Sequence, residues 1–247
     1  MEKLIYNIFN KIFMNEVESE LLEYISGEEN KIIFDVGCFR GNFTKNIIKQ
    51  ESKKNKKSNF FLFDPNPNAR NYLNFLLKDK NIKYFNIALD NSNCKKKFTL
   101  NQYFEASGSS LVSLHKEDKL YNFTRKNFMK FFQPFKKIKD YVEIDVKTQT
   151  LDNFCLENKI NCIHLLKLDT EGNEFNILKG AENLLSKNKV KVIYTEICSN
   201  KKDYNNKSYE IKNFLKKYNF VHIKSYKIPT LGILSKLKAT DNLFVLK

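Results

Sequence analysis

The stretch KIIFDVGCFRGNFTKNIIKQ, Lys31–Gln50, contains the two patterns on which the fold prediction rests. Its first part, Ile32–Val36, is a short apolar run that leads into a glycine-containing turn, as a buried parallel strand does. Its second part, Asn42–Gln50, has apolar residues at helical spacing and polar residues near its start that can cap a helix. The stretch therefore predicts a strand, a tight turn and a helix, which is the repeating unit of an α/β sheet.

The same alternation recurs along the chain. Phe60–Pro67 predicts a second strand closed by turn residues, Asn68–Asp79 a second helix, and Ile82–Leu89 a third strand. Further strands are expected within Tyr141–Thr150, Ile160–Asp169, Val190–Ile197, Phe220–Ile228 and Asn242–Lys247, with helices between most of them. Strands that alternate with helices favour a doubly wound α/β fold with right-handed crossovers.

The chain of 247 residues fits one large domain. Residues 1–30 are expected to contain an amphipathic helix that packs on the domain, and residues 31–247 to form the domain itself. A loop-rich insertion is expected near residues 95–140. In it, Lys95–Phe104 is expected to add a strand at a sheet edge, and a phenylalanine-rich segment, residues 128–135, has helical spacing. No apolar run is long enough to predict a transmembrane helix.

Composition restricts the class of protein less than the motifs do. The five cysteines are scattered without a CxxC pair, which is typical of a reduced, cytoplasmic protein without a disulfide framework or zinc site. The net charge of +15 invites a nucleic-acid surface, but only three of the 43 basic residues are Arg. A lysine-rich composition from an AT-rich genome explains the charge equally simply, so the charge alone decides nothing.

The turn after the first strand combines an acid with two glycines. Asp35, Gly37 and Gly41 lie in or beside this turn, and glycine lets a backbone turn sharply and approach a ligand closely. The dinucleotide motif G-x-G-x-x-G is not matched, because Phe39 stands where its second glycine would be. An acid before the first glycine suits a cationic ligand group. The structural alternative is a tight turn without a ligand.

Polar residues also end the next two predicted strands. Asp64 follows Gly41 by 23 residues, close to where an acid binds ribose hydroxyls in nucleotide-binding α/β folds. A carboxylate can accept from both hydroxyls. The alternative role is a helix N-cap, for which the proline-containing turn places Asp64 too early. Asn86 and Ala88 end the third predicted strand, beside the position that an adenine would take.

Acidic residues end two later strands. In LLKLDTEGNEFNILKG, Leu165–Gly180, Asp169 and Glu171 follow a buried strand, and Glu196 ends the next one. If these strands are parallel, the three acids meet at the carboxyl edge of the sheet. They could serve as a general base, hold a divalent cation such as Mg²⁺ or Mn²⁺ through Asp169 and Glu196, or contact a cationic cofactor. The alternative for Glu171 is a favourable charge at a helix N-terminus.

These motifs, in this order, resemble the FkbM family of S-adenosylmethionine-dependent methyltransferases. The matching stretches are FDVGCFRGNFT, FLFDPNPNARNYL, NIALDN, SGSSL, VKTQTLDNF and LLKLDTEGNEFNILKGAENLL, which together extend from about Ile32 to Glu196. The resemblance implies a class I methyltransferase fold, in which a mostly parallel sheet of about seven strands has an antiparallel last strand. It also implies methyl transfer to a hydroxyl group, commonly of a sugar in a glycan or glycoconjugate.

The resemblance further implies a set of site residues. The cofactor residues would be Asp35, Gly37, Cys38, Gly41 and Asn42 around the methionine end, Asp64 and Pro65 at the ribose, and Asn86 and Ala88 at the adenine. Asp169 would activate the acceptor hydroxyl as a base or through a metal, with Glu171 or Glu196 assisting. Two positions depart from the family pattern: Phe39 stands where Asn is usual, and Asp64 where Glu is commoner.

Two other functions compete with a sugar O-methyltransferase. An RNA ribose 2′-O-methyltransferase would also use acids and lysines around a reacting hydroxyl, and the basic net charge is compatible with RNA. A binding module that has kept the fold without catalysis is the other alternative, and Phe39 in the cofactor turn is the feature in its favour.

Overall fold

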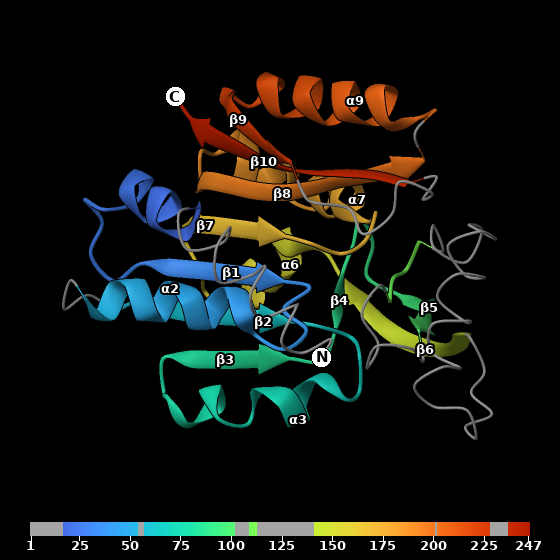
Figure 1. Ribbon diagram of the computed structural model, residues 1–247, viewed down its shortest axis with the longest axis horizontal. Helices are drawn as coiled ribbons and strands as arrows, with labels where there is room; N and C mark the ends of the chain where they lie inside the picture. The colour runs from blue at the N-terminus through green and yellow to red at the C-terminus, as the bar shows by residue number, and fades with distance from the viewer. Residues whose placement is uncertain (1–16, 54–56, 102–108, 113–140, 201, 228–236) are drawn as a thin grey trace.

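The computed structural model describes residues 17–53, 57–101, 109–112, 141–200, 202–227 and 237–247 (Figure 1). The strands are β1 (Ile32–Val36), β2 (Asn59–Phe63), β3 (Ile82–Phe85), β4 (Ala88–Leu89), β5 (Lys95–Asn101), β6 (Tyr141–Gln149), β7 (Ile163–Leu168), β8 (Val190–Asn200), β9 (Phe220–Lys227) and β10 (Leu237–Leu246). The helices are α2 (Asn42–Ser52), α3 (Ala69–Leu73), the 3₁₀ turn η1 (Leu76–Lys78), α6 (Leu151–Glu157), α7 (Glu174–Lys179), α8 (Glu182–Ser186) and α9 (Tyr204–Lys217). Within these ranges, no helix has the length and apolar character needed to cross a membrane.

The main sheet has seven strands in the order β3-β2-β1-β7-β8-β10-β9. The first five are parallel to one another, whereas β10 runs antiparallel to both of its neighbours, β8 and β9. Helices cover both faces (Figure 1). The predicted fold class is therefore confirmed: an α/β, mostly parallel sheet of seven strands with its last strand antiparallel.

Each parallel strand sends alternate side chains to two separate cores. In β1, Ile33 belongs to the core beneath α2 and α3, and Phe34 to the core beneath the helices of the other face. In β7, Leu165 and Leu166 divide in the same way. Since side chains alternate along a strand, a sheet that is covered on both faces needs apolar residues at successive positions. This requirement explains the unbroken apolar runs in the sequence.

Residues 17–24 are helical and pack on the α2 face through Leu21, Leu22 and Ile25 just beyond. This segment lies within the helix expected over residues 1–30, of which residues 1–16 lie outside the described part. The same helix buries Glu18 completely, and its Oε1 accepts a hydrogen bond from the Asn46 side chain of α2. Burial is the main reason why the pKa of Glu18 is raised to about 7, against the lowering effect of that hydrogen bond.

Replacing Glu18 by Gln should stabilise the fold at alkaline pH. The folded-state pKa lies above the unfolded one, so Glu18 favours folding below its unfolded pKa and loses this contribution as the pH rises through about 7. We expect Glu18→Gln to raise the free energy of unfolding by on the order of 1–3 kcal/mol near pH 8, with the gain vanishing near pH 4.5. Urea denaturation at both values tests this. Glu23→Gln, at an exposed position of the same helix, should show no such gain, and an equal gain in both variants would contradict the role of burial.

The third predicted strand is divided between two sheets. β3 ends at Phe85, and Ala88 and Leu89 form β4, which pairs with β6. The break falls at Asn86, whose side chain donates to the carbonyl oxygens of Asp64 and Asn66 instead of extending the strand. The prediction of one continuous strand over 82–89 is therefore wrong. The second predicted helix is likewise shorter, because α3 ends at Leu73 and η1 follows it.

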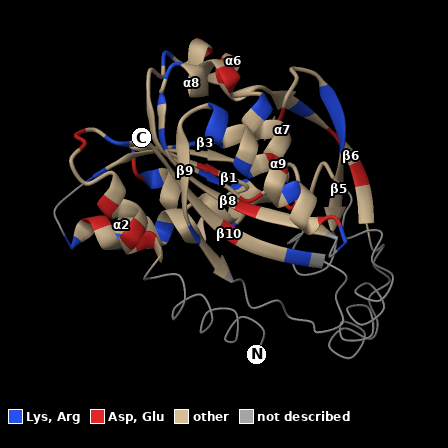
Figure 2. Ribbon diagram, turned by 90° about the horizontal axis from the view of Figure 1, so that it is seen from above, with Lys and Arg blue, Asp and Glu red and all other residues tan. Residues whose placement is uncertain are grey.

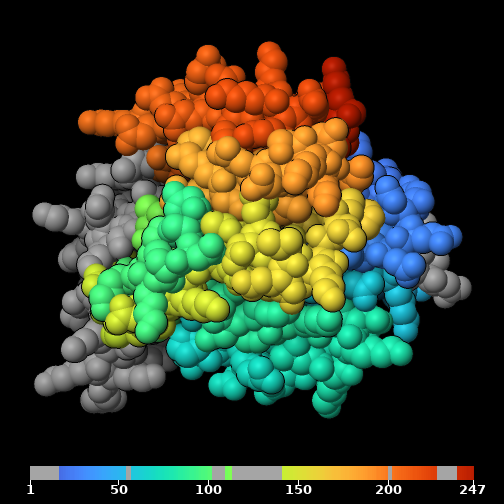
Figure 3. Space-filling model, turned by 180° about the vertical axis from the view of Figure 1, so that it is seen from behind, coloured from blue at the N-terminus to red at the C-terminus, as the bar shows by residue number. Residues whose placement is uncertain are grey.

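A second sheet of three strands, in the order β4-β6-β5, lies beyond the carboxyl ends of the main parallel strands (Figure 1). The strand expected at a sheet edge within Lys95–Phe104 is β5, which lies at the edge of this second sheet and pairs antiparallel with β6. Seen from behind, this sheet forms one flank of the molecule beside the segment of α6 (Figure 3). The insertion expected near 95–140 thus contributes to a sheet that extends from Ala88 to Gln149. Its phenylalanine-rich part, residues 128–135, lies outside the described residues.

Candidate active site

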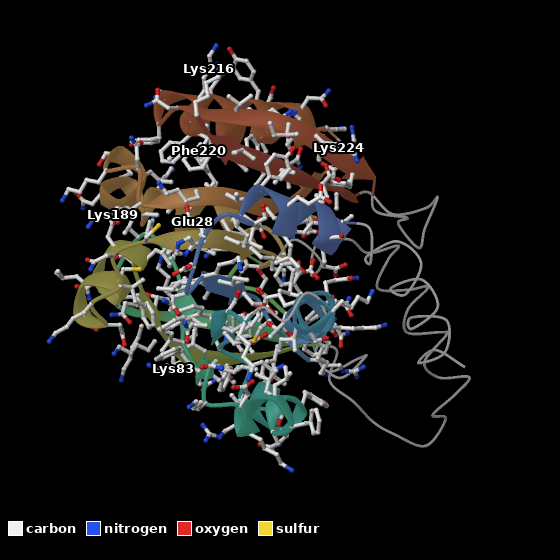
Figure 4. The ribbon with its side chains drawn as sticks, turned by 90° about the vertical axis from the view of Figure 1, so that its left-hand side faces the viewer. Glu28, Lys83, Lys189, Lys216, Phe220 and Lys224 are labelled. Atoms are coloured by element: carbon white, nitrogen blue, oxygen red, sulfur yellow. The ribbon has the colours of Figure 1, made fainter. Side chains whose placement is uncertain are left out.

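A cavity of about 330 Å³ lies where the parallel strands of the main sheet end and the second sheet begins. The edge at which these strands start is on the opposite side of the sheet, where Figure 4 shows Glu28, Lys83 and Lys189. Nine of the predicted site residues line the cavity: Gly37, Cys38, Asn42, Asp64, Pro65, Ala88, Asp169, Glu171 and Glu196. The second sheet adds Phe98, Ser109 and Leu111 to the wall. Ligands bind at this edge in open α/β sheets.

Gly37 fixes the first turn against the end of β7. It has a φ of 75°, and an added Cβ would lie 1.8 Å from the carbonyl oxygen of Asp169. The backbone N–H of Asp169 donates to Val36 over 3.0 Å. A residue with a side chain would therefore push apart the two loops that form the floor of the cavity.

Gly41, by contrast, is required by packing. Its φ is 69°, and an added Cβ would lie 2.6 Å from Leu76 and 2.8 Å from Leu73. It does not line the cavity. Gly41 was predicted to lie around the cofactor, but the structure places it away from the cavity. Its lack of a side chain lets α2 approach α3 and η1.

Asp35 is also set back from the cavity. Its side chain is fully buried, accepts from the Thr44 hydroxyl over 2.7 Å and forms an ion pair with Lys167 over 3.2 Å. The pairing of β1 with β7 places Asp35 and Lys167 directly opposite each other. The carboxylate expected to face the methionine end of the cofactor therefore compensates a buried lysine, and what reaches the cavity is the Lys167 side chain.

Lys167 joins the three parts of the floor. Its Nζ lies 3.2 Å from a carboxylate oxygen of Asp35, 3.2 Å from one of Asp169 and 3.2 Å from the carbonyl oxygen of Gly37. The pKa of Lys167 is raised, because these carboxylates outweigh the lowering effect of burial. Lys167 is thus a fixed cation at the base of the cavity.

Asp64 lines the cavity but is held by backbone groups. Its two oxygens accept from the N–H of Phe39 over 2.9 Å and of Asn66 over 2.8 Å. Burial raises the pKa of Asp64 to about 6, although both hydrogen bonds lower it. Asn86, predicted beside the adenine, does not line the cavity, because its amide is bound to the carbonyls of the Asp64 turn. These contacts connect the ends of β1, β2 and β3.

Phe39 lies at the cavity wall in a left-handed conformation, with a φ of 44°. The guanidinium of Arg40 lies 5.1 Å from the Phe39 ring centroid and 5.2 Å from that of Tyr72. The cation–π contacts and the hydrogen bond to Asp64 hold the turn in this form.

Besides Asp64, three predicted acids, Asp169, Glu171 and Glu196, and one unpredicted acid, Asp241, line the cavity. The Asp169 side chain is 47% exposed to it. The pKa of Asp169 is raised because the concave site withdraws it from water, while Lys167 lowers it and Glu171 raises it. The pKa of Glu196 is raised well above its usual range by burial and then by Glu171, Asp169 and further acids. Asp241 of β10 faces Glu196 in the β8–β10 register, and burial raises its pKa to about 6.

Three side chains that can bind a cation lie close together, but their grouping alone does not establish a cation site. Ligand atoms of Glu171, Glu196 and Cys198 all lie within 4.8 Å of one another. Asp169, which was expected to share a divalent cation with Glu196, is not one of this group. Carboxylate and thiolate donors suit a divalent ion. A metal at this site therefore stays a prediction.

The seven-stranded, mostly parallel sheet with its last strand antiparallel, and the cavity at its carboxyl edge, match the arrangement expected of a class I methyltransferase. The domain model of the FkbM methyltransferases matches residues 35–221, and the chain belongs to this family. The expected family is thereby confirmed, and with it an S-adenosylmethionine-dependent methyltransferase.

Two of the solved structures that the chain resembles are distant in sequence. The N-methyltransferase NodS from Bradyrhizobium japonicum WM9 is 8% identical, with a TM-score of 0.45 over 95% of this chain and 96% of that one. A SAM-dependent methyltransferase from Aquifex aeolicus is 13% identical, with a TM-score of 0.41 over 92% and 89% of the two chains. No curated protein matches the sequence.

The cavity fits S-adenosylmethionine in size and charge. Its volume of about 330 Å³ lies within the range of small-molecule pockets, and its carboxylates suit a ligand with a sulfonium and an ammonium group. Gly37, Asp64 and Ala88, which were predicted for the methionine, ribose and adenine parts, all line it. These contacts remain predictions. When bound, the cofactor supplies a methyl group on a positively charged sulfur.

Proposed function

We propose that the protein transfers a methyl group to a hydroxyl oxygen of a sugar or a similar polyol. The observation that carries the proposal is the charge of the cavity. The part of its wall that the structure describes contains five carboxylates, those of Asp64, Asp169, Glu171, Glu196 and Asp241, against two basic side chains, Arg40 and Lys167. Carboxylates accept from the paired hydroxyls of a polyol, so this lining suits a neutral, hydroxyl-rich acceptor.

The proposal is supported by Asp169, which can act as the base that the reaction needs. A hydroxyl oxygen becomes a good nucleophile as its proton leaves, and a carboxylate with a raised pKa is suited to receive it. Lys167, 3.2 Å away, fixes one oxygen of Asp169, so the other oxygen can face the acceptor. Positioning the hydroxyl in line with the methyl group supplies much of the remaining acceleration.

The cavity is less suited to RNA, the main alternative acceptor. Phosphates near five carboxylates would be repelled, and in the described wall only Arg40 and Lys167 could offset this repulsion. Among the described residues, basic positions are spread over several elements, including α9, β10 and β6 (Figure 2). The five cysteines are unpaired, which supports the proposal that the protein works in the reducing cytoplasm.

Product analysis tests the proposal. Methyl-tritiated S-adenosylmethionine would be incubated with the protein and a panel of hexoses, deoxyhexoses and their methyl glycosides, with transcribed RNA as a separate arm. We expect an alkali-stable methyl ether on a sugar and none on RNA. Label on RNA alone would overturn the acceptor class.

Cofactor binding measured by calorimetry, without any acceptor, separates an enzyme from a binding module. Repeating the assay with EDTA separates a carboxylate base from a metal.

A further inference from the structure

The loop between β7 and α7 holds Glu171 in an unfavourable backbone conformation. Glu171 has a φ of 57° and the next residue, Gly172, a φ of 112°. The left-handed region is natural for glycine but strained for a residue with a side chain. In this conformation the Glu171 carboxylate lies close to a second carboxylate, that of Glu196. The strained backbone opposes this placement. Other groups must hold it.

Glu174 holds the loop from its inner side. Its side chain is completely buried in the first turn of α7. One of its oxygens, Oε1, accepts from the N–H of Thr170 over 2.8 Å, from the N–H of Gly172 over 3.0 Å and from the hydroxyl of Thr170 over 2.9 Å. The two amides belong to the residues on either side of Glu171, so Glu174 fixes the backbone across that residue.

Ser110 and Lys207 hold the loop from two other elements. The hydroxyl of Ser110, a residue bridged to Thr99 of the second sheet, donates to the carbonyl oxygens of Thr170 over 2.9 Å and Glu171 over 3.1 Å in a shared bond. The Lys207 ammonium, on α9, donates to the carbonyl oxygens of Gly172 over 2.8 Å and Cys198 over 2.9 Å. Ser110 is almost fully buried. The loop is thus tied to the second sheet, to β8 and to α9.

We infer that Ser110, Glu174 and Lys207 are positioning residues that set the Glu171 carboxylate against Glu196 in the cavity. We call these three side chains the loop clamp. The inference rests on the proposed function only in taking Glu171 and Glu196 as part of the acceptor site. The clamp makes the geometry of this carboxylate pair depend on the second sheet, which lies across the cavity from the strand ends.

Amide hydrogen exchange tests whether the clamp exists. Glu174→Ala should raise the exchange rate of the Thr170 and Gly172 amides by about tenfold or more, since it removes their acceptor. Glu174→Gln should protect them nearly as well as the native residue, because its amide oxygen can take the place of Oε1. Equal protection in the Ala and native proteins would overturn the clamp. If Glu174→Ala does not fold, the Ser110→Ala variant below still decides the question.

Carboxyl carbon-13 NMR tests whether the clamp positions Glu171. The acids that raise the pKa of Glu196 are Glu171, Asp169, Glu174 and Asp241. Releasing Glu171 should therefore lower the pH at which Glu196 titrates. We expect this shift in Ser110→Ala and in Glu171→Gln, and no larger shift in the double variant, because both changes remove one interaction. Ser186→Ala, which removes a hydroxyl from exposed α8, is the matched control and should leave Glu196 unchanged.

The outcomes separate the inference from the proposed function. Unchanged titration in Ser110→Ala, or fully additive shifts in the double variant, would overturn the positioning role whichever acceptor is methylated. Confirmed titration shifts together with failure to methylate any sugar would overturn the proposed acceptor and leave the clamp standing. Neither NMR nor exchange requires an acceptor to be known.

Discussion

Asp169→Asn should lower kcat by roughly 10²–10⁴-fold, the usual contribution of a general base, while leaving the Kd of S-adenosylmethionine nearly unchanged. Asparagine keeps the shape of the side chain and an oxygen for Lys167, which lies 3.2 Å from the native carboxylate. It cannot take a proton from a hydroxyl. The measurements are single-turnover methyl transfer to the best sugar of the panel and calorimetric titration with the cofactor.

The pH profile gives the same prediction a second test. Asp169 must be ionised to act as a base, and its pKa is raised by its withdrawal from water. Activity should therefore fall as the pH is lowered through that raised pKa, and Asp169→Asn should lose this acid limb. Asp145→Asn, which removes an exposed carboxylate paired with Lys97 on the second sheet, is the control. Normal turnover in Asp169→Asn would rule out Asp169 as the base.

Lys167→Met should destabilise the fold more than any other single change considered. Lys167 is buried and pairs with Asp35, which is fully buried, and with Asp169. Removing the cation leaves Asp35 without its charged partner, and breaking a buried ion pair from one side costs about 3–5 kcal/mol. Urea denaturation monitored by circular dichroism measures the loss.

Two further variants show whether the lost charge is the cause. Asp35→Asn added to Lys167→Met should restore part of the stability, because the buried charge is then gone. Lys97→Met, which breaks the exposed pair with Asp145, should leave the unfolding midpoint almost where it was. If Lys167→Met and Lys97→Met unfold at the same urea concentration, the buried pair does not stabilise the floor of the site.

The main sheet was predictable because its signals are local. The apolar runs of β1, β2, β7 and β8, each followed by a helical pattern, are visible without knowledge of the partner strands. Two of the acids that line the cavity were predictable for the same reason: Asp64 and Asp169 lie just after strand ends, and parallel strands bring their ends to one edge. The prediction that Glu196 ends its strand is wrong, because β8 continues to Asn200, but the pairing of Leu168 with Thr195 still places Glu196 level with the end of β7.

The other features of the fold and site depend on pairings between segments that are distant in sequence, so they were not predictable from local patterns. Asp35 is compensated by Lys167 only through the β1–β7 register, and Asp241 reaches Glu196 only because β10 pairs antiparallel with β8. The second sheet joins Ala88 to Thr148, 60 residues along the chain. Gly41 was misinterpreted for a different reason. A glycine that is needed for helix packing cannot be distinguished by its local sequence from one that is needed to approach a ligand.

The position of β10 has a consequence for biosynthesis. It follows all the other strands in sequence, yet it lies between β8 and β9 and brings Asp241 to the cavity. During synthesis the earlier strands leave the ribosome first, but a domain generally folds as a unit. Until β10 has emerged, β8 lacks one of its two neighbours and the cavity lacks Asp241. The enzyme can close its acceptor wall only when synthesis has passed β10, so the incomplete chain carries no finished site.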